Sequence, residues 1–124
     1  MSVFDTSAVL AILYDEDGRA EAEARLGDGV ISTVNVAEVI GDFVASGRGD
    51  LVGAVDALEE LALALEPPTM EHAIRAAALK KTVRNLSLGD RFCIALGESR
   101  NDRLVTSDQA WAQLKLSIPV EFIR

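Results

Sequence analysis

The stretch SVFDTSAVLAIL, residues 2–13, sets a pattern that the rest of the chain repeats. Val3 and Phe4 make a short apolar run that ends at Asp5, as expected of a brief strand. The run from Ser7 to Leu13 is apolar and long enough for a helix. We therefore predict a strand followed at once by a helix, with Asp5 at the junction.

Strands and helices alternate along the remainder of the sequence. The further strands are predicted at 30–32, 64–66, 103–106 and 120–123, and the helices at 19–26, 36–44, 51–63, 70–84, 87–101 and 108–114. This alternation indicates an α/β fold with a parallel sheet covered by helices on both faces and joined by right-handed crossovers. In such sheets ligands bind beyond the carboxyl ends of the strands.

The composition is that of one globular domain spanning residues 1–124. The single cysteine, Cys93, lies in an apolar run, which excludes a disulfide framework and a cysteine-rich zinc site and fits the reducing cytoplasm. The short apolar stretch near the start has no basic residues before it and acids soon after it. We expect neither a secretory signal nor a membrane span.

Charge is distributed unevenly along the chain. The net charge of −8 argues against general affinity for nucleic acid, since phosphate binding depends on Lys and Arg. Residues 1–62 carry 13 acids and 3 bases, whereas residues 63–124 carry 7 acids and 9 bases. The second half can hold a local anionic partner, although alternating charge on solvated helix faces explains the same pattern.

Four acids stand where the local pattern predicts the start of a helix: Asp5, Glu38, Asp90 and Asp108. Asp5 ends the first strand, and Asp108 follows the strand at 103–106 by two positions. Both must lie at the carboxyl edge of the sheet. If all four acids meet there, a hard divalent cation is the expected partner that holds them together.

Each acid also has an explanation as a helix cap, because carboxylates favour the positive end of a helix. Three patterns resemble capping boxes: Ser87-x-x-Asp90, Asn35-x-x-Glu38 and Thr106-x-x-Gln109. Asp90 is the strongest candidate for a functional acid because the residues that follow it, Phe92 to Leu96, are apolar. Glu38 lies away from the apolar stripe of its helix, so it is a ligand only if that face lines the cleft.

Other residues also have a functional and a structural interpretation. His72, the only histidine, is far in sequence from the acids, so a Ser-His-Asp mechanism has little support. Arg91 next to Asp90 has two interpretations, binding of RNA phosphate and pairing with an acid. Trp111, Phe92 and Phe122 are expected in the core rather than as base-stacking platforms.

Four segments together resemble a PIN-domain ribonuclease of the VapC toxin type. They are MSVFDTSAVLAIL (1–13), NVAEVIGDF (35–43), SLGDRFCIAL (87–96) and RLVTSDQAW (103–111), of which SLGDRFCIAL is the most specific. The resemblance covers essentially the whole chain. It departs at Gln109, where these toxins often carry arginine.

The resemblance implies a PIN-like three-layer sandwich with a central parallel sheet. It places Asp5, Glu38, Asp90 and Asp108 at the positions of the family's catalytic acids, which bind Mg²⁺ or Mn²⁺. The implied function is a metal-dependent endoribonuclease that hydrolyses RNA with metal-activated water, as the toxin of a toxin–antitoxin pair. A homodimer and a small antitoxin protein are the implied partners.

Two alternatives belong to other classes. A phosphoacceptor signalling domain has a similar length and an acid cluster, but it needs an acceptor aspartate at the end of a central strand and a lysine ending a late one. Asp56 lies in a helical pattern instead, and the late strand ends in Thr106. A degenerate PIN fold that serves only as a binding scaffold is the other alternative.

Overall fold

The computed structural model describes all 124 residues and contains the predicted alternation of strands and helices. In chain order the elements are β1 (Ser2–Phe4), α1 (Thr6–Leu13), α2 (Arg19–Glu23), the 3₁₀ helix η1 (Leu26–Asp28), β2 (Gly29–Ser32), α3 (Thr33–Ala45), α4 (Leu51–Glu60), β3 (Ala64–Glu66), α5 (Met70–Thr82), α6 (Leu88–Arg100), β4 (Arg103–Thr106), the 3₁₀ helix η2 (Gln109–Gln113) and β5 (Val120–Phe122).

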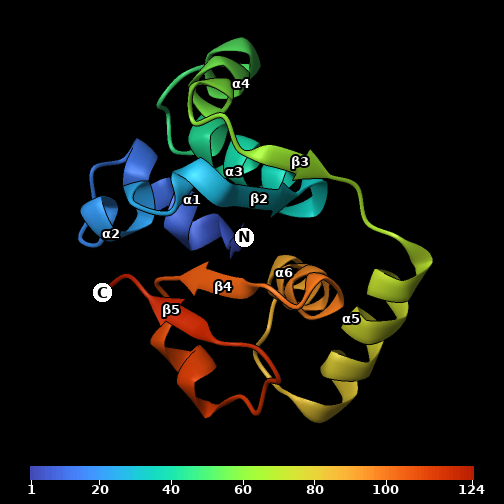
Figure 1. Ribbon diagram of the computed structural model, residues 1–124. Coiled ribbons are helices and arrows are strands. Elements are labelled where there is room, and N and C mark those ends of the chain that lie inside the picture. The colour runs from blue at the N-terminus through green and yellow to red at the C-terminus, as the bar shows by residue number, and fades with distance from the viewer.

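The five strands form one sheet in the order β3-β2-β1-β4-β5, and every neighbouring pair is parallel. From β1 the chain adds strands on one side of the sheet and then crosses to the other side at β4 (Figure 1). The order therefore reverses between β1 and β4, where open parallel sheets hold their ligands.

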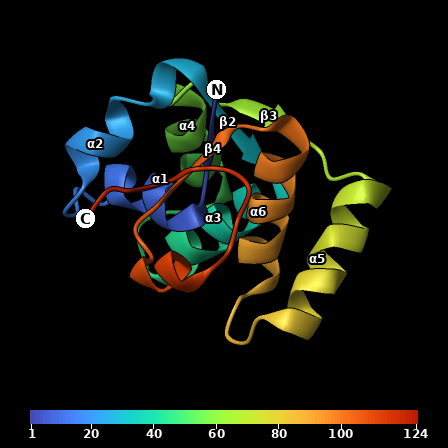
Figure 2. The same cartoon turned by 60° about the horizontal axis from the view of Figure 1, so that its bottom comes forward.

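Alternate residues of each strand point to opposite faces of the sheet. Phe4 and Ile31 enter the core under α1, α3 and α4, whereas their neighbours Val3 and Val30 enter the core under α5 and α6. The helices thus cover both faces, as Figures 1 and 2 show. The predicted three-layer α/β sandwich is confirmed.

Helix α6 is the most enclosed helix of the molecule. Seven of its residues are buried: Gly89, Arg91, Cys93, Ile94, Ala95, Leu96 and Gly97. It packs between the sheet and α5, which lies on its outer side (Figure 2). The start of α6 is therefore fixed relative to the sheet edge, as the apolar sequence after Asp90 predicted.

Several predicted boundaries were too long. The helix expected over 19–26 ends at Glu23 and gives way to η1, in which Gly27 is a poor helix former. The helix expected over 108–114 is the 3₁₀ helix η2, and α4 and α5 end before residues 63 and 84. None of the helices is both long enough and apolar enough to cross a membrane.

Candidate active site

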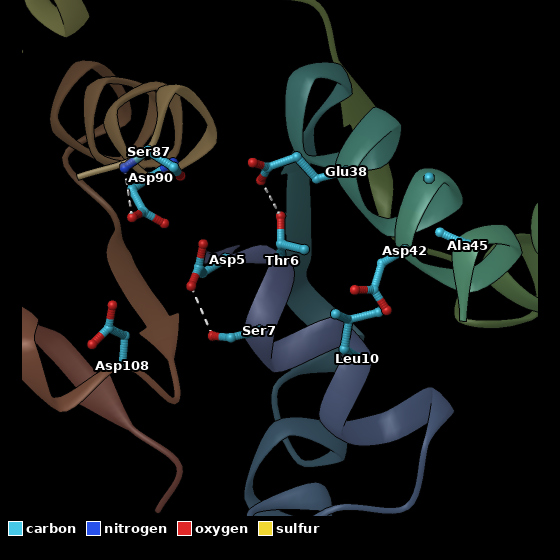
Figure 3. Close-up of a pocket in the computed structure, with 11 residues that line it drawn as sticks. Asp5, Thr6, Ser7, Leu10, Glu38, Asp42, Ala45, Ser87, Asp90 and Asp108 are labelled. Carbon is cyan, nitrogen blue, oxygen red and sulfur yellow. Dashed lines mark hydrogen bonds between the residues drawn. The ribbon is translucent and has the colours of Figure 1, made fainter. Parts of the chain in front are cut away.

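Asp5 and Asp108 lie together beyond the carboxyl ends of β1 and β4, where the strand order reverses. Asp5 directly follows β1, and Thr106 ends the neighbouring β4 two residues before Asp108. Figure 3 shows both carboxylates pointing into one cavity, with Asp90 on the α6 side and Glu38 on the α3 side. All four predicted acids line this cavity.

Asp5 is only 2% exposed, although its carboxyl group faces the cavity. Its Oδ2 accepts hydrogen bonds from Ser7 Oγ at 2.7 Å and Thr106 Oγ1 at 2.9 Å. Burial raises the pKa of Asp5 from 3.8 to about 6, against the lowering effect of the Ser7 bond and with a smaller contribution from the charge of Asp90. Oδ1 of Asp5 is buried without any hydrogen-bond partner.

Two hydroxyl groups connect Asp5 to the segment that carries Asp108. The Ser107 N–H donates to Ser7 Oγ at 3.0 Å, and the Asp108 N–H donates to Thr106 Oγ1 at 3.0 Å. Ser7 and Thr106 also hold Asp5, so Thr106 contacts both acids and Ser7 joins Asp5 to the backbone of Ser107. This network fixes the sheet-edge half of the site across about 100 residues of sequence.

Asp90 opens α6 through a complete capping box with Ser87. The Ser87 N–H donates to Asp90 Oδ2 and the Asp90 N–H donates to Ser87 Oγ, both at 3.0 Å. Burial raises the pKa of Asp90, the two Ser87 hydrogen bonds oppose this, and the charges of Glu38 and Asp108 raise it further. Capping therefore fixes the direction of a carboxylate that also faces other acids.

Glu38 faces the cavity from α3, which settles the orientation that the helical pattern left open. Thr6 Oγ1 donates to Glu38 Oε1 at 2.6 Å, so the first turn of α1 anchors this carboxylate. The Asn35-x-x-Glu38 cap prediction is wrong, because Ser32 caps α3 through the Val34 N–H. Glu38 is held by tertiary contacts instead.

Asn35 and Gly89 support the helix half of the site, a role that the sequence did not indicate for either residue. Asn35 is fully buried, and its Nδ2 donates to Gly89 O at 3.1 Å, Thr6 Oγ1 at 3.0 Å and Glu38 Oε1 at 3.3 Å. A Cβ at residue 89 would overlap the Glu38 carboxylate. Asn35 thus joins α1, α3 and α6, and glycine lets α6 approach α3.

The caps divide the four acids into two kinds. Asp90 and Asp108 both accept backbone hydrogen bonds at a helix start, Asp108 from the Ala110 N–H at 3.0 Å. Asp5 occupies the N-cap position of α1 without making a side-chain cap. The predicted Thr106-x-x-Gln109 box is wrong, because Asp108 takes that role.

The cavity has a volume of about 610 Å³ and is strongly acidic. Its lining residues are Asp5, Thr6, Ser7, Leu10, Glu38, Gly41, Asp42, Ala45, Ser87, Asp90 and Asp108. Asp42 is a fifth acid that the sequence did not single out, and Tyr14 Oη donates to it at 2.6 Å. The lining contains no basic side chain, so an anionic ligand needs a counter-charge to enter.

The donor set suits a hard divalent cation. Asp5 has a buried carboxylate oxygen without a partner, and the pKa values of Asp5 and Asp90 are raised. Both features are expected of a site that binds a positive ion, when that ion is absent. No three side chains form a ready cage around one point. Mg²⁺ usually binds through one or two carboxylates and keeps several waters, so such a cage is not required.

The other weighed residues lie away from the acids. Arg91 is 9% exposed and its Nη1 donates to Ala76 O at 3.1 Å, so both interpretations of Arg91 are wrong. His72 closes the capping box of α5 and contacts Ser99 Oγ at 2.9 Å. Trp111 is buried in the core, as expected.

Comparison with known families identifies the fold family. The family model described as PIN domain matches residues 2–116. The chain belongs to the PIN domain family. A search of curated proteins found no match for this PIN domain.

Solved structures share this PIN fold over nearly their whole length. A toxin–antitoxin complex from Klebsiella pneumoniae is 21% identical, with a TM-score of 0.72 and coverage of 100% of this chain and 98% of that one. VapBC2 from Rickettsia felis, bound to a promoter DNA fragment, is 15% identical, with a TM-score of 0.74 and coverage of 97% and 96%. VapBC-5 from Mycobacterium tuberculosis is 24% identical, with a TM-score of 0.65 and coverage of 99% and 97%.

Proposed function

We propose that this PIN domain is a Mg²⁺-dependent endoribonuclease, with Mn²⁺ as a possible substitute. The observation that carries the proposal is the convergence of Asp5, Glu38, Asp90 and Asp108 on one cavity at the strand-order reversal. An acid-lined cavity without histidine, lysine or cysteine suits metal-assisted phosphodiester hydrolysis better than catalysis by a nucleophile triad.

The chain's own residues have distinct parts in this chemistry. Asp5 and Asp90 would hold the metal ion, and Glu38 and Asp108 would complete the site or orient the attacking water. When bound, the ion lowers the pKa of water and stabilises charge on the phosphate. Ser7 and Thr106 occupy Asp5 Oδ2 with hydrogen bonds, so the unpartnered Oδ1 would be the oxygen of Asp5 that holds the ion.

We further propose that the protein is the toxin of a toxin–antitoxin pair that acts in the cytoplasm. The support is that structures of the same fold come from toxin–antitoxin complexes of several bacteria. A small antitoxin protein would block the acid cavity, and the toxin would form a homodimer. The remaining partner is RNA, the substrate whose phosphodiester bonds are hydrolysed at the acid cavity.

RNA cleavage in vitro tests the nuclease proposal. Purified protein is incubated with labelled RNA in Mg²⁺, in Mn²⁺ and in EDTA, beside the variants Asp90→Asn and Asp56→Asn. Asp56 lies on α4 outside the cavity, so its variant is a matched control for the loss of one charge. We expect cleavage in either metal, none in EDTA, and a loss of about a thousandfold for Asp90→Asn alone. Cleavage that survives both EDTA and Asp90→Asn would refute the metal mechanism.

Growth of expressing cells tests the toxin role separately. Induction of the wild-type chain is expected to arrest growth, and Asp5→Asn is expected to relieve the arrest at equal protein level. Measured Mg²⁺ binding without cleavage of any RNA would instead support the scaffold alternative.

A further inference from the structure

A second cavity of about 450 Å³ opens between the end of α5 and the segment after η2, and it differs in charge from the acid cavity. Its lining residues are Arg75, Leu79, Thr82, Val83, Arg84, Gln113, Leu114, Lys115 and Leu116. Three of these side chains are basic, two are neutral and polar, and none is acidic. We define this set of residues as the basic cavity.

The positive charge of the basic cavity is not neutralised within the molecule. Arg84 and Lys115 are exposed and form no ion pair, in a chain whose net charge is −8. Arg75 is different, because its Nε lies 2.7 Å from Glu98 Oε1. Two free cations therefore face an opening that has no acid of its own.

The remaining wall of the basic cavity is apolar. Val83, Leu114 and Leu116 are partly buried and pack against the core beside the buried Leu79. Thr82 and Gln113 add a hydroxyl and an amide at the same opening. Cations beside an apolar wall with a few hydrogen-bonding groups match a nucleotide, in which phosphate, ribose and base are joined.

The two cavities are neighbours along two separate segments of the chain. Arg84 precedes Ser87, which lines the acid cavity, by three residues, a span of at most about 11 Å. On the other segment, η2 begins directly after Asp108 and ends at Gln113, which lines the basic cavity with the residues that follow it. A single RNA strand that reaches the acids is therefore within a few nucleotides of the basic cavity.

We propose that the basic cavity binds the RNA strand beside the phosphodiester that is cut. Arg84 and Lys115 each bind a backbone phosphate, and the adjoining ribose or base lies against Val83, Leu114 and Leu116. The inference rests on the proposed nuclease function and specifies where its substrate is held. It supplies what the acid cavity lacks, since five carboxylates repel RNA and a bound ion offsets only part of their charge.

The experiment measures RNA binding apart from cleavage. Fluorescence anisotropy follows a labelled single-stranded RNA pool of random sequence with full-length protein in EDTA, over a series of salt concentrations. The test variant is Arg84→Ala with Lys115→Ala. The matched control is Lys80→Ala with Lys81→Ala, which removes the same charge from exposed positions near the end of α5 that do not line the cavity. KM for RNA cleavage in Mg²⁺ is measured for each protein.

We expect the test variant to bind RNA about tenfold more weakly and to lower the slope of log K against log salt by about 1.4, or about 0.7 for each lost phosphate contact. The control is expected to change affinity by less than about threefold. In Mg²⁺ the test variant should raise KM with little change in kcat, because the residues hold RNA and do not touch the reacting atoms.

An equal loss of RNA affinity in the test and control variants would show that only long-range charge attraction is affected, and it would overturn the proposal. Unchanged affinity in the test variant overturns it too. A dimer that dissociates only in the test variant, measured by sedimentation, would identify the basic cavity as a contact between copies of this chain and overturn RNA binding there. If binding depends on the cavity but no RNA is cut, the nuclease proposal fails and the binding site stands.

Discussion

The two halves of the acid cavity are held in different ways. On the sheet-edge half, Asp5 and Asp108 follow neighbouring parallel strands, and two shared hydroxyl groups lock them together. On the helix half, Glu38 and Asp90 depend on how closely α3 and α6 approach each other. The first half is positioned by backbone pairing and the second by helix packing, so the second half should be the more sensitive to small changes in side-chain volume.

Among changes outside the four acids, Gly89→Ala should have the largest effect, because it acts on the approach of α6 to α3. The added Cβ would overlap the Glu38 carboxylate, so α6 or Glu38 must move. We expect stability to change by less than about 1 kcal/mol, because only the flexible end of Glu38 has to move, and RNA cleavage to fall by about a hundredfold or more. Urea unfolding and kcat/KM measure the two effects.

Gly27→Ala is the control, since a Cβ there meets nothing within 4 Å and Gly27 does not line the acid cavity. It should change stability by less than about 1 kcal/mol and leave RNA cleavage unaltered. If Gly89→Ala cleaves RNA as well as Gly27→Ala does, the helix half does not depend on close packing.

Asp5→Asn tests how much the buried charge of Asp5 destabilises the protein when no metal is bound. A carboxyl group with a pKa of 3.8 when unfolded and about 6 when folded binds its proton more tightly in the folded state. Stability conferred by that proton is therefore present below about pH 4 and lost as the pH rises through about 6. The loss amounts to roughly 3 kcal/mol at most, because a difference of one unit between the folded and unfolded pKa corresponds to 1.36 kcal/mol.

The variant should therefore be more stable than the wild type at pH 8 in EDTA, by about 1–3 kcal/mol. The advantage should shrink to near zero at about pH 4, where the Asp5 carboxyl group is protonated. Thermal unfolding at several pH values measures this difference. Saturating Mg²⁺ should reverse it, because only the wild type gains stability from the ion. A constant difference across the pH range contradicts the prediction.

Thr106→Val removes the hydroxyl that holds both Asp5 and the Asp108 N–H while keeping the shape of the side chain. We expect cleavage to fall about 10- to 100-fold, as for loss of a group that orients a metal ligand. Mn²⁺ affinity, measured by calorimetry, should weaken in step. Thr82→Val on α5 removes an exposed hydroxyl outside the acid cavity and should leave Mn²⁺ affinity unchanged. Unaltered Mn²⁺ affinity in Thr106→Val would show that the hydroxyl network does not position Asp5.

Arg91→Met should have the smallest effect on activity, although residue 91 follows Asp90 directly. Its guanidinium is buried and donates to Ala76 O, so it joins α6 to α5 and does not face the acids. We expect a loss of stability of about 1 kcal/mol with kcat/KM within about twofold of the wild type. Selective loss of RNA affinity in this variant would restore the phosphate-binding interpretation.

The sequence pattern alone predicted most of the fold and half of the acid cavity. The strands were predicted because short apolar runs separated by helical periodicity are local signals. Asp5 and Asp108 followed from the strands, since the carboxyl ends of parallel strands share one edge. Glu38 rested on family resemblance, because its helical face gave no indication of what it would contact.

The sequence by itself determined the order of strands and helices, the sheet edge at which Asp5 and Asp108 lie, and the capping box that directs Asp90. These depend on residues within a few positions of one another or on a general rule for parallel sheets. Only the tertiary structure decided the direction of Glu38, the roles of Asn35 and Gly89, and the separation of acid and basic cavities. Those features depend on distances between packed elements far apart in the sequence, and packing distances are set by the whole core.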